Sequence, residues 1–193
     1  MTSGRTIVLS FNSANTPGNL IVAYVVWGNN GAVTLGDSRG NQYASAVGPH
    51  TFAANQYRAQ VFYAKNVAGG TNTVTATFAT TIGNFGLLYL HEYAGVDRVD
   101  PFDVTAGATG TTVLADSGTA TTRAGNELLV GVGMTAHAYT GPGTGYTSRI
   151  ITTPDADIAE DRVVASAGTY RATAPQNCAG AWIMQLVSFK GTT

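Results

Sequence analysis

The first half of this chain is echoed by its second half, and neither half shows a helical pattern. The apolar run from Gly18 to Trp27 aligns with the run from Gly125 to Met134. Residues 73–77 and 87–93 then align with residues 169–173 and 183–189 at one shared offset. Each copy is too small to bury its own apolar face. We therefore expect one domain over residues 1–193, built from two similar units of about residues 1–97 and 98–193.

Short apolar and β-branched runs recur between Gly, Asn, Asp and Pro, which is typical of an all-β sandwich. No window has a sustained 3.6-residue apolar period with a start and a stop. The nearly continuous apolar runs at 20–27 and 85–90 predict strands covered on both faces. Hairpin turns are expected at residues 28–31 and 37–41. We expect an antiparallel two-sheet β-sandwich of jelly-roll type with an internal pseudo-repeat.

The expected strands follow from these runs and their boundaries. They cover residues 6–11, 20–27, 32–35, 42–47, 57–65, 72–80, 85–93, 104–106, 118–122, 127–135, 146–152, 162–167, 170–173 and 181–190.

Composition excludes several classes of partner. Charged residues make up 11% of the chain and the formal net charge is −1, so we expect no nucleic-acid partner. No stretch approaches the roughly 18 apolar residues of a membrane span. The first residues lack the regions of a signal peptide, so an export signal is expected outside this chain. The single cysteine, Cys178, cannot form an internal disulfide and is expected to be a small buried side chain.

The most distinctive motif lies between the two halves. Residues 92–97 are Glu-Tyr-Ala-Gly-Val-Asp, and residues 100–103 are Asp-Pro-Phe-Asp. Together with residues 18–22, 63–66 and 182–185, these segments resemble uncharacterised domains of secreted bacterial proteins. Such domains are similar to jelly-roll, concanavalin A-like or carbohydrate-binding modules. The resemblance implies an extracellular or cell-surface bacterial module, and it transfers no site residue.

Aromatic and polar side chains alternate along two expected strands. Tyr57 and Arg58 lie on opposite faces of one strand, whereas Tyr89 and His91 share a face of another. The repeat aligns Tyr89 with Gln185. Because rings stack on pyranose faces while amides bond the ring substituents, these five residues are candidates for a carbohydrate-binding groove. The alternative is that the aromatic rings fill the core between the sheets.

Acidic residues gather in two expected loops. One group lies in the segment between the halves: Asp97, Asp100 and Asp103. The other is the better candidate for a Ca²⁺ site: Asp155, Asp157, Glu160 and Asp161. The spacing lacks the pattern of an EF-hand loop. The alternative is a set of solvated carboxylates neutralised by Arg98, Arg149 and Arg162.

The preferred function is a non-catalytic accessory or adhesion module that binds a polysaccharide or cell-surface glycan. The first alternative is a structural or assembly module of a cell-surface or filament protein, self-associating through its edge strands. The second alternative is a small glycoside hydrolase or lyase. Its carboxylates would come from the glutamates of the chain, Glu92, Glu127 and Glu160, although the sequence places no pair of them.

Overall fold

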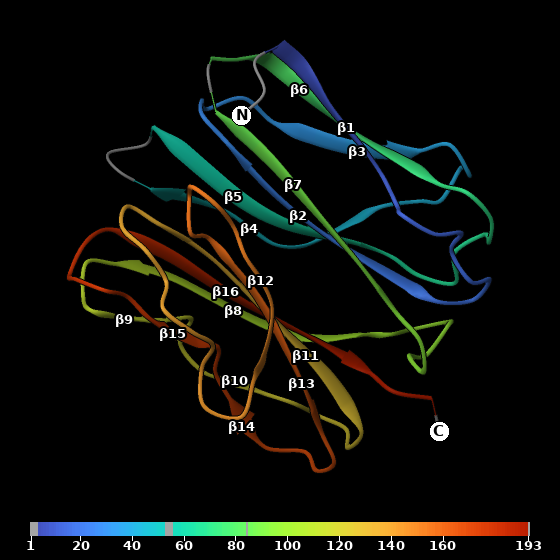
Figure 1. Ribbon diagram of the computed structural model, residues 1–193. Coiled ribbons are helices and arrows are strands. Elements are labelled where there is room, and N and C mark those ends of the chain that lie inside the picture. Colours follow the sequence, from blue (N-terminus) through green and yellow to red (C-terminus); the bar gives the residue numbers. More distant parts are fainter. Residues whose placement is uncertain (1–3, 53–55, 84, 193) are drawn as a thin grey trace.

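Figure 1 shows the computed structural model, which describes residues 4–52, 56–83 and 85–192. These residues form sixteen strands and no helix. All pairings between the strands are antiparallel. The expected all-β, sandwich-like architecture is therefore confirmed.

The first half of the chain forms two sheets. The outer sheet has the order β1-β6-β3 and consists of β1 (Gly4–Ser10), β6 (Thr73–Ile82) and β3 (Val33–Asp37). The first inner sheet has the order β4-β5-β2-β7 and consists of β4 (Ala44–Phe52), β5 (Tyr57–Ala64), β2 (Leu20–Trp27) and β7 (Gly86–Tyr93).

The second half forms one large sheet and two ribbons. The second inner sheet has the order β12-β13-β11-β16-β8 and consists of β12 (Thr147–Ile151), β13 (Ile158–Val164), β11 (Glu127–Thr135), β16 (Trp182–Lys190) and β8 (Phe102–Gly110). One ribbon pairs β15 (Thr173–Pro175) with β9 (Leu114–Asp116). The other pairs β10 (Ala120–Thr121) with β14 (Thr169–Tyr170).

The sheets and ribbons are stacked in layers, with three apolar clusters between them (Figure 1). Along β2, Val22, Tyr24 and Val26 face the second inner sheet, whereas Val25 and Trp27 face the outer sheet. The central cluster takes side chains from both halves of the chain. The expectation of only two sheets is wrong, because strands that are apolar on both faces need a covering layer on each side.

The apolar run at 20–27 is buried along its whole length, as expected, and the structure shows the same for β11 at 127–135. β7 differs. It lies at an edge of the first inner sheet, and five of its eight residues are only partly buried, so the expected cover on both faces of 85–90 is incomplete.

The two expected hairpins are also corrected. β2 and β4 belong to the first inner sheet, whereas β3 pairs with β6 in the outer sheet. The segments at 28–31 and 37–41 therefore carry the chain from one sheet to another. Their turn residues reverse the chain locally, but the pairing of β3 is decided by its contact with β6.

Three further expectations change at the level of single segments. β9 was not expected at all. The strand expected at 162–167 lies at β13 instead, so that Glu160 and Asp161 are strand residues. Cys178 is exposed, not buried. The acidic residues at 160 and 161 did not resemble a buried strand. In the structure their carboxylates bond the Gly143 backbone and the Arg149 side chain, and the sequence does not show these contacts.

Candidate ligand-binding groove

A groove opens where the chain crosses from the outer sheet to the first inner sheet, between β3 and β4. It has a volume of about 670 Å³ and is lined by Gly40, Asn41, Gln42, Tyr43, Ala44, Tyr63, Lys65, Asn66, Arg98 and Val99. The crossing segment, the end of β5 and the segment between the halves each form one wall. The lining combines two tyrosines, three side-chain amides and two cations, and it contains no carboxylate.

Asp37 holds the crossing segment in shape from beneath the groove. Its carboxylate accepts hydrogen bonds from the backbone of Arg39 and Asn41, both at 3.0 Å, and from the Asn41 side chain at 2.8 Å. The Tyr43 hydroxyl and the Asn72 amide also donate to it, each at 2.9 Å. Burial alone would raise the pKa of Asp37, but these donors outweigh it and lower the pKa. The groove wall is therefore pre-organised.

The two tyrosines are half-buried and present part of each ring to the groove. Tyr63 stacks on Phe102, with ring centroids 5.8 Å apart and planes at 14°. Tyr43 packs against the cluster under the outer sheet and donates its hydroxyl to Asp37. Burial raises the pKa of both tyrosines, so their hydroxyls are neutral at physiological pH.

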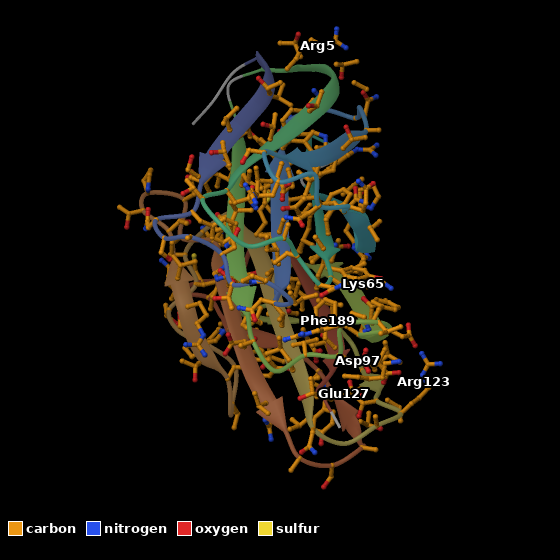
Figure 2. The ribbon with its side chains drawn as sticks, turned by 90° about the vertical axis from the view of Figure 1, so that its right-hand side faces the viewer. Arg5, Lys65, Asp97, Arg123, Glu127 and Phe189 are labelled. Atoms are coloured by element: carbon orange, nitrogen blue, oxygen red, sulfur yellow. The ribbon has the colours of Figure 1, made fainter. Side chains whose placement is uncertain are left out.

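The segment between the halves carries one cation of the groove, Arg98, and holds the other, Lys65. Lys65 donates a hydrogen bond to the Val99 carbonyl. The Asp97 carboxylate accepts from the backbone N–H of Val99 at 2.7 Å and of Asp100 at 2.9 Å, and these bonds lower the pKa of Asp97. Figure 2 shows Lys65 and Asp97 on the same flank of the molecule. Arg98 and Val99, which lie between the two pieces of the motif at 92–97 and 100–103, thus form one wall of the groove.

The predicted sugar-binding residues do not lie in this groove. Tyr89 is buried in the central cluster between the inner sheets. Gln185 is fully buried and bonds His50 at 2.7 Å and the Ala59 carbonyl at 3.2 Å. His91 shares the face of Tyr89 and is partly buried; burial lowers its pKa. The face of β7 that was expected to carry the sugar-binding groove is covered by the second inner sheet, because both inner sheets place apolar side chains there.

Tyr57 and Arg58 point to opposite sides of β5. Arg58 is partly buried opposite Trp27. Tyr57 contacts Phe85 edge-on, with ring centroids 5.2 Å apart, and lies 6.0 Å from Phe52. These three rings line a second cleft of about 450 Å³ at another place between the inner sheets, together with Met134, Thr135, Ala136, His137, Pro154, Asp155 and Asp157.

The predicted Ca²⁺ ligands are not brought together. Asp157 and Asp161 face the first inner sheet, whereas Glu160 points to the other side of β13 and accepts from the Gly143 backbone at 2.7 Å. Asp161 forms a two-point ion pair with Arg149 at 2.6 and 2.7 Å. Within the described part of the chain, no three His, Cys, Asp or Glu residues are placed to hold a metal ion. The Ca²⁺ site stays a prediction without a geometry that supports it.

Two of these carboxyl groups are held away from water. Burial raises the pKa of Asp157 to about 8, although the Thr135 backbone N–H donates to it at 3.0 Å. Burial likewise raises the pKa of Glu160 to about 7. Asp155, which is partly buried at the rim of the second cleft, is the remaining member of the predicted set.

The glutamates considered for catalysis are held by hydrogen bonds or are buried. Glu92 accepts three hydrogen bonds of 2.7 Å, from the side chains of Asn15 and Asn19 and from the Thr16 backbone. Glu127 is fully buried and burial raises its pKa. It lies beside Asp103, whose pKa is lowered by the Arg123 hydrogen bonds despite burial. Figure 2 shows Glu127 and Arg123 at the end of the molecule opposite Arg5.

Sequence reasoning missed the groove because its residues come from three separate segments. A usable indication was present: Tyr63 to Asn66 and the segment around Asp97 both carry the resemblance described above, and both border the groove. Their proximity follows from the order β5-β2-β7, in which Ala64 and Tyr93 both lie beside the start of β2, and the local sequence pattern does not reveal this order.

Comparison with known proteins identifies no relative of this chain. The chain matches no family model, no curated protein and no solved structure. Among the described residues, no helix has the length and apolar character needed to cross a membrane.

Proposed function

We propose that this protein is a non-catalytic carbohydrate-binding module and that the groove between β3 and β4 binds the sugar. The observation that carries the proposal is the composition of the groove lining: two tyrosines beside three side-chain amides, on a wall held rigid by Asp37. Tyrosine rings supply apolar area for a sugar ring, and amides donate to and accept from hydroxyl groups. A rigid wall reduces the entropy lost on binding.

The wider setting of the module is part of the proposal. We infer an accessory or adhesion module of an extracellular bacterial protein, whose partner is a polysaccharide or cell-surface glycan. Its low charge and the resemblance of its motifs to secreted domains support this setting. One groove gives weak affinity, which rises when several modules act in tandem.

The jelly-roll form and the duplication also belong to the proposal. The strand order β4-β5-β2-β7 in one inner sheet has the counterpart β12-β13-β11-β16 in the other. In both cases the strand in the third position is the long apolar one, β2 or β11. This correspondence supports an origin from two copies of one unit.

One observation favours the assembly alternative. β1 is an edge strand of the outer sheet, and its Val8 and Leu9 side chains are 60% and 39% exposed. An exposed apolar edge is a surface on which another strand can add. The hydrolase alternative has no comparable support, since no carboxylate lines the groove and the three glutamates are bonded or buried.

Titration of the protein with a panel of oligosaccharides tests the proposal. The double variant Gln42→Ala, Asn66→Gly should weaken binding roughly thirtyfold, because it removes two side chains worth about 1 kcal/mol each as hydrogen-bonding partners. The matched control is Asn30→Ala, which removes an exposed amide from the turn after β2. A chelator should leave binding unchanged, since the groove has no carboxylate to hold a metal ion.

Two outcomes would contradict the proposal. If no saccharide in the panel binds, the groove is not a sugar site; concentration-dependent association in sedimentation measurements would then favour the assembly alternative. If saccharides bind but the double variant binds as well as the Asn30→Ala control, the sugar site lies elsewhere.

A further inference from the structure

The charges of the groove are all of one sign, in a chain that has few charges. Lys65 and Arg98 line it and no acidic residue does. The chain contains only one other lysine, Lys190, which pairs with Asp100 at 2.6 Å. Two cations that line one groove are therefore a departure from the general composition of this protein.

Neither cation is neutralised by an ion pair. The described residues form four salt bridges, and these use Arg123, Arg149, Arg171 and Lys190. The acidic groups of the adjacent segment have other hydrogen-bond partners, since Asp97 accepts two backbone N–H groups and Asp100 binds Lys190. The charge of Lys65 reaches Asp97 and adds to the lowering of the Asp97 pKa, but the two side chains form no salt bridge. Lys65 uses one of its three N–H donors on the Val99 carbonyl, so two remain.

The Arg98 side chain is held in place by packing, and its N–H groups donate no hydrogen bond within the described residues. Its guanidinium lies against the backbone of Gly18, where an added Cβ atom would be only 2.6 Å from Cζ and Nε. Gly18 has a φ of 88°, a conformation that also favours glycine. Among residues 4–52, 56–83 and 85–192, no acceptor is bonded to the Arg98 side chain. Its planar fork of donors is available for a ligand in the groove.

We propose that the groove recognises an anionic saccharide, one whose sugar units carry a carboxylate or a sulfate group. The inference rests on the proposed function and specifies its ligand. Arg98 would bind the anionic group through two N–H donors, Lys65 would add a second positive charge, and Tyr43, Tyr63 and the amides would contact the neutral part of the sugar. The bonds are charge-assisted, so added salt weakens them.

Isothermal titration with three matched ligands tests the inference: a galacturonic acid oligomer, a sulfated galactose oligomer and the neutral galactose oligomer of equal length. The anionic ligands should bind more tightly than the neutral one. Arg98→Gln should weaken only the anionic ligands, by roughly tenfold or more. Arg171→Gln is the matched control, because it removes the same charge from a partly exposed pair with Asp116 in the second half.

The outcomes separate the two proposals. Preference for the uronate or for the sulfated ligand identifies the anionic group. Equal binding of neutral and anionic ligands, unaffected by Arg98→Gln, overturns this inference and leaves the carbohydrate-binding function standing. Failure of all three ligands to bind overturns this inference; if the wider panel also fails, the proposed function is overturned with it.

Discussion

At the scale of single residues, the most consequential side chains are carboxylates whose role is set by their surroundings. Asp37 is ionised and accepts five hydrogen bonds, from Arg39, Asn41, Tyr43 and Asn72. Asp157 has only the Thr135 backbone N–H as a bonded donor and lies near the hydroxyls of buried tyrosines. The same residue type is thus a fixed anion in one place and a protonated group in another.

This difference predicts how stability depends on pH. The folded protein holds the proton of Asp157 up to about pH 8, whereas the unfolded chain releases it near the ordinary value of 3.8. The stability that Asp157 contributes is present at acidic pH and is lost as the pH rises through about 8. Asp157→Asn keeps the acceptor for Thr135 and carries no titrating proton. In urea unfolding between about pH 5 and pH 9, its free energy of unfolding should fall less steeply than that of the unmodified protein.

Several titratable groups face Asp157 and influence its titration. They are Asp155, whose charge raises its pKa further, and the hydroxyls of Tyr24, Tyr89 and Tyr139. Glu160, with a pKa of about 7, acts in the same direction, so the double variant with Glu160→Gln should flatten the slope further. An unchanged slope in Asp157→Asn would show that this carboxyl group is ionised in the folded protein.

At the scale of elements, the fold depends on contacts that tie crossing segments to strands. Glu92 on β7 ties down the segment between β1 and β2 through its bonds to Asn15, Thr16 and Asn19. Asp37 does the same for the segment between β3 and β4. Both segments connect the outer sheet with the first inner sheet, so each carboxylate fixes a connection that has no ladder of its own.

Glu92→Ala should therefore loosen one connection while the sheets persist. Removal of three acceptor bonds leaves the Asn15 side chain, which is almost fully buried, without its partner. We expect faster hydrogen exchange at residues 15–19 and a loss of about 1–3 kcal/mol in the free energy of unfolding. Asp100→Ala, which removes an exposed partner of Lys190, is the control and should cost less. Unaltered exchange at residues 15–19 would mean that the backbone bonds of this segment suffice to hold it.

At the scale of the whole molecule, the two halves share their main core. The central cluster contains Val22, Tyr24 and Val61 from the first half and Val130, Ile183 and Phe189 from the second. The ring of Phe189 lies 5.4 Å from that of Tyr63. Neither inner sheet can cover its apolar face alone, so the halves are expected to unfold together.

The fluorescence of the two tryptophans can show whether the halves unfold together. Trp27 lies under the outer sheet in the first half, and Trp182 lies under the ribbons in the second. Variants that keep one tryptophan each, Trp27→Phe and Trp182→Phe, let fluorescence follow each half separately. Phe189→Ala should lower the stability by about 3–5 kcal/mol and shift both transitions equally. Separate midpoints for the two tryptophans would show two independent folding units.

Local pattern was sufficient to predict the strand class, most strand positions and the burial of β2. Alternation and propensity act within one segment, so the chain reveals them directly. The same pattern predicted hairpins where the chain crosses between sheets, because the pairing of β3 with the distant β6 is not visible in a local segment. It also misplaced β13, because the bonds of Asp161 to Arg149 and of Glu160 to Gly143 are tertiary contacts that local alternation does not show.

The candidate site was decided by tertiary structure. Tyr89 and Gln185 have the residue types of a sugar site, but both are buried between the two inner sheets, Tyr89 on β7 and Gln185 on β16. Tyr63, Lys65 and Arg98 meet because β5 and β7 flank β2, and Tyr43 joins them on the segment that returns the chain from β3 in the outer sheet to β4. Residue types set what chemistry is available, and the packing of whole sheets determines which of those side chains reach solvent together.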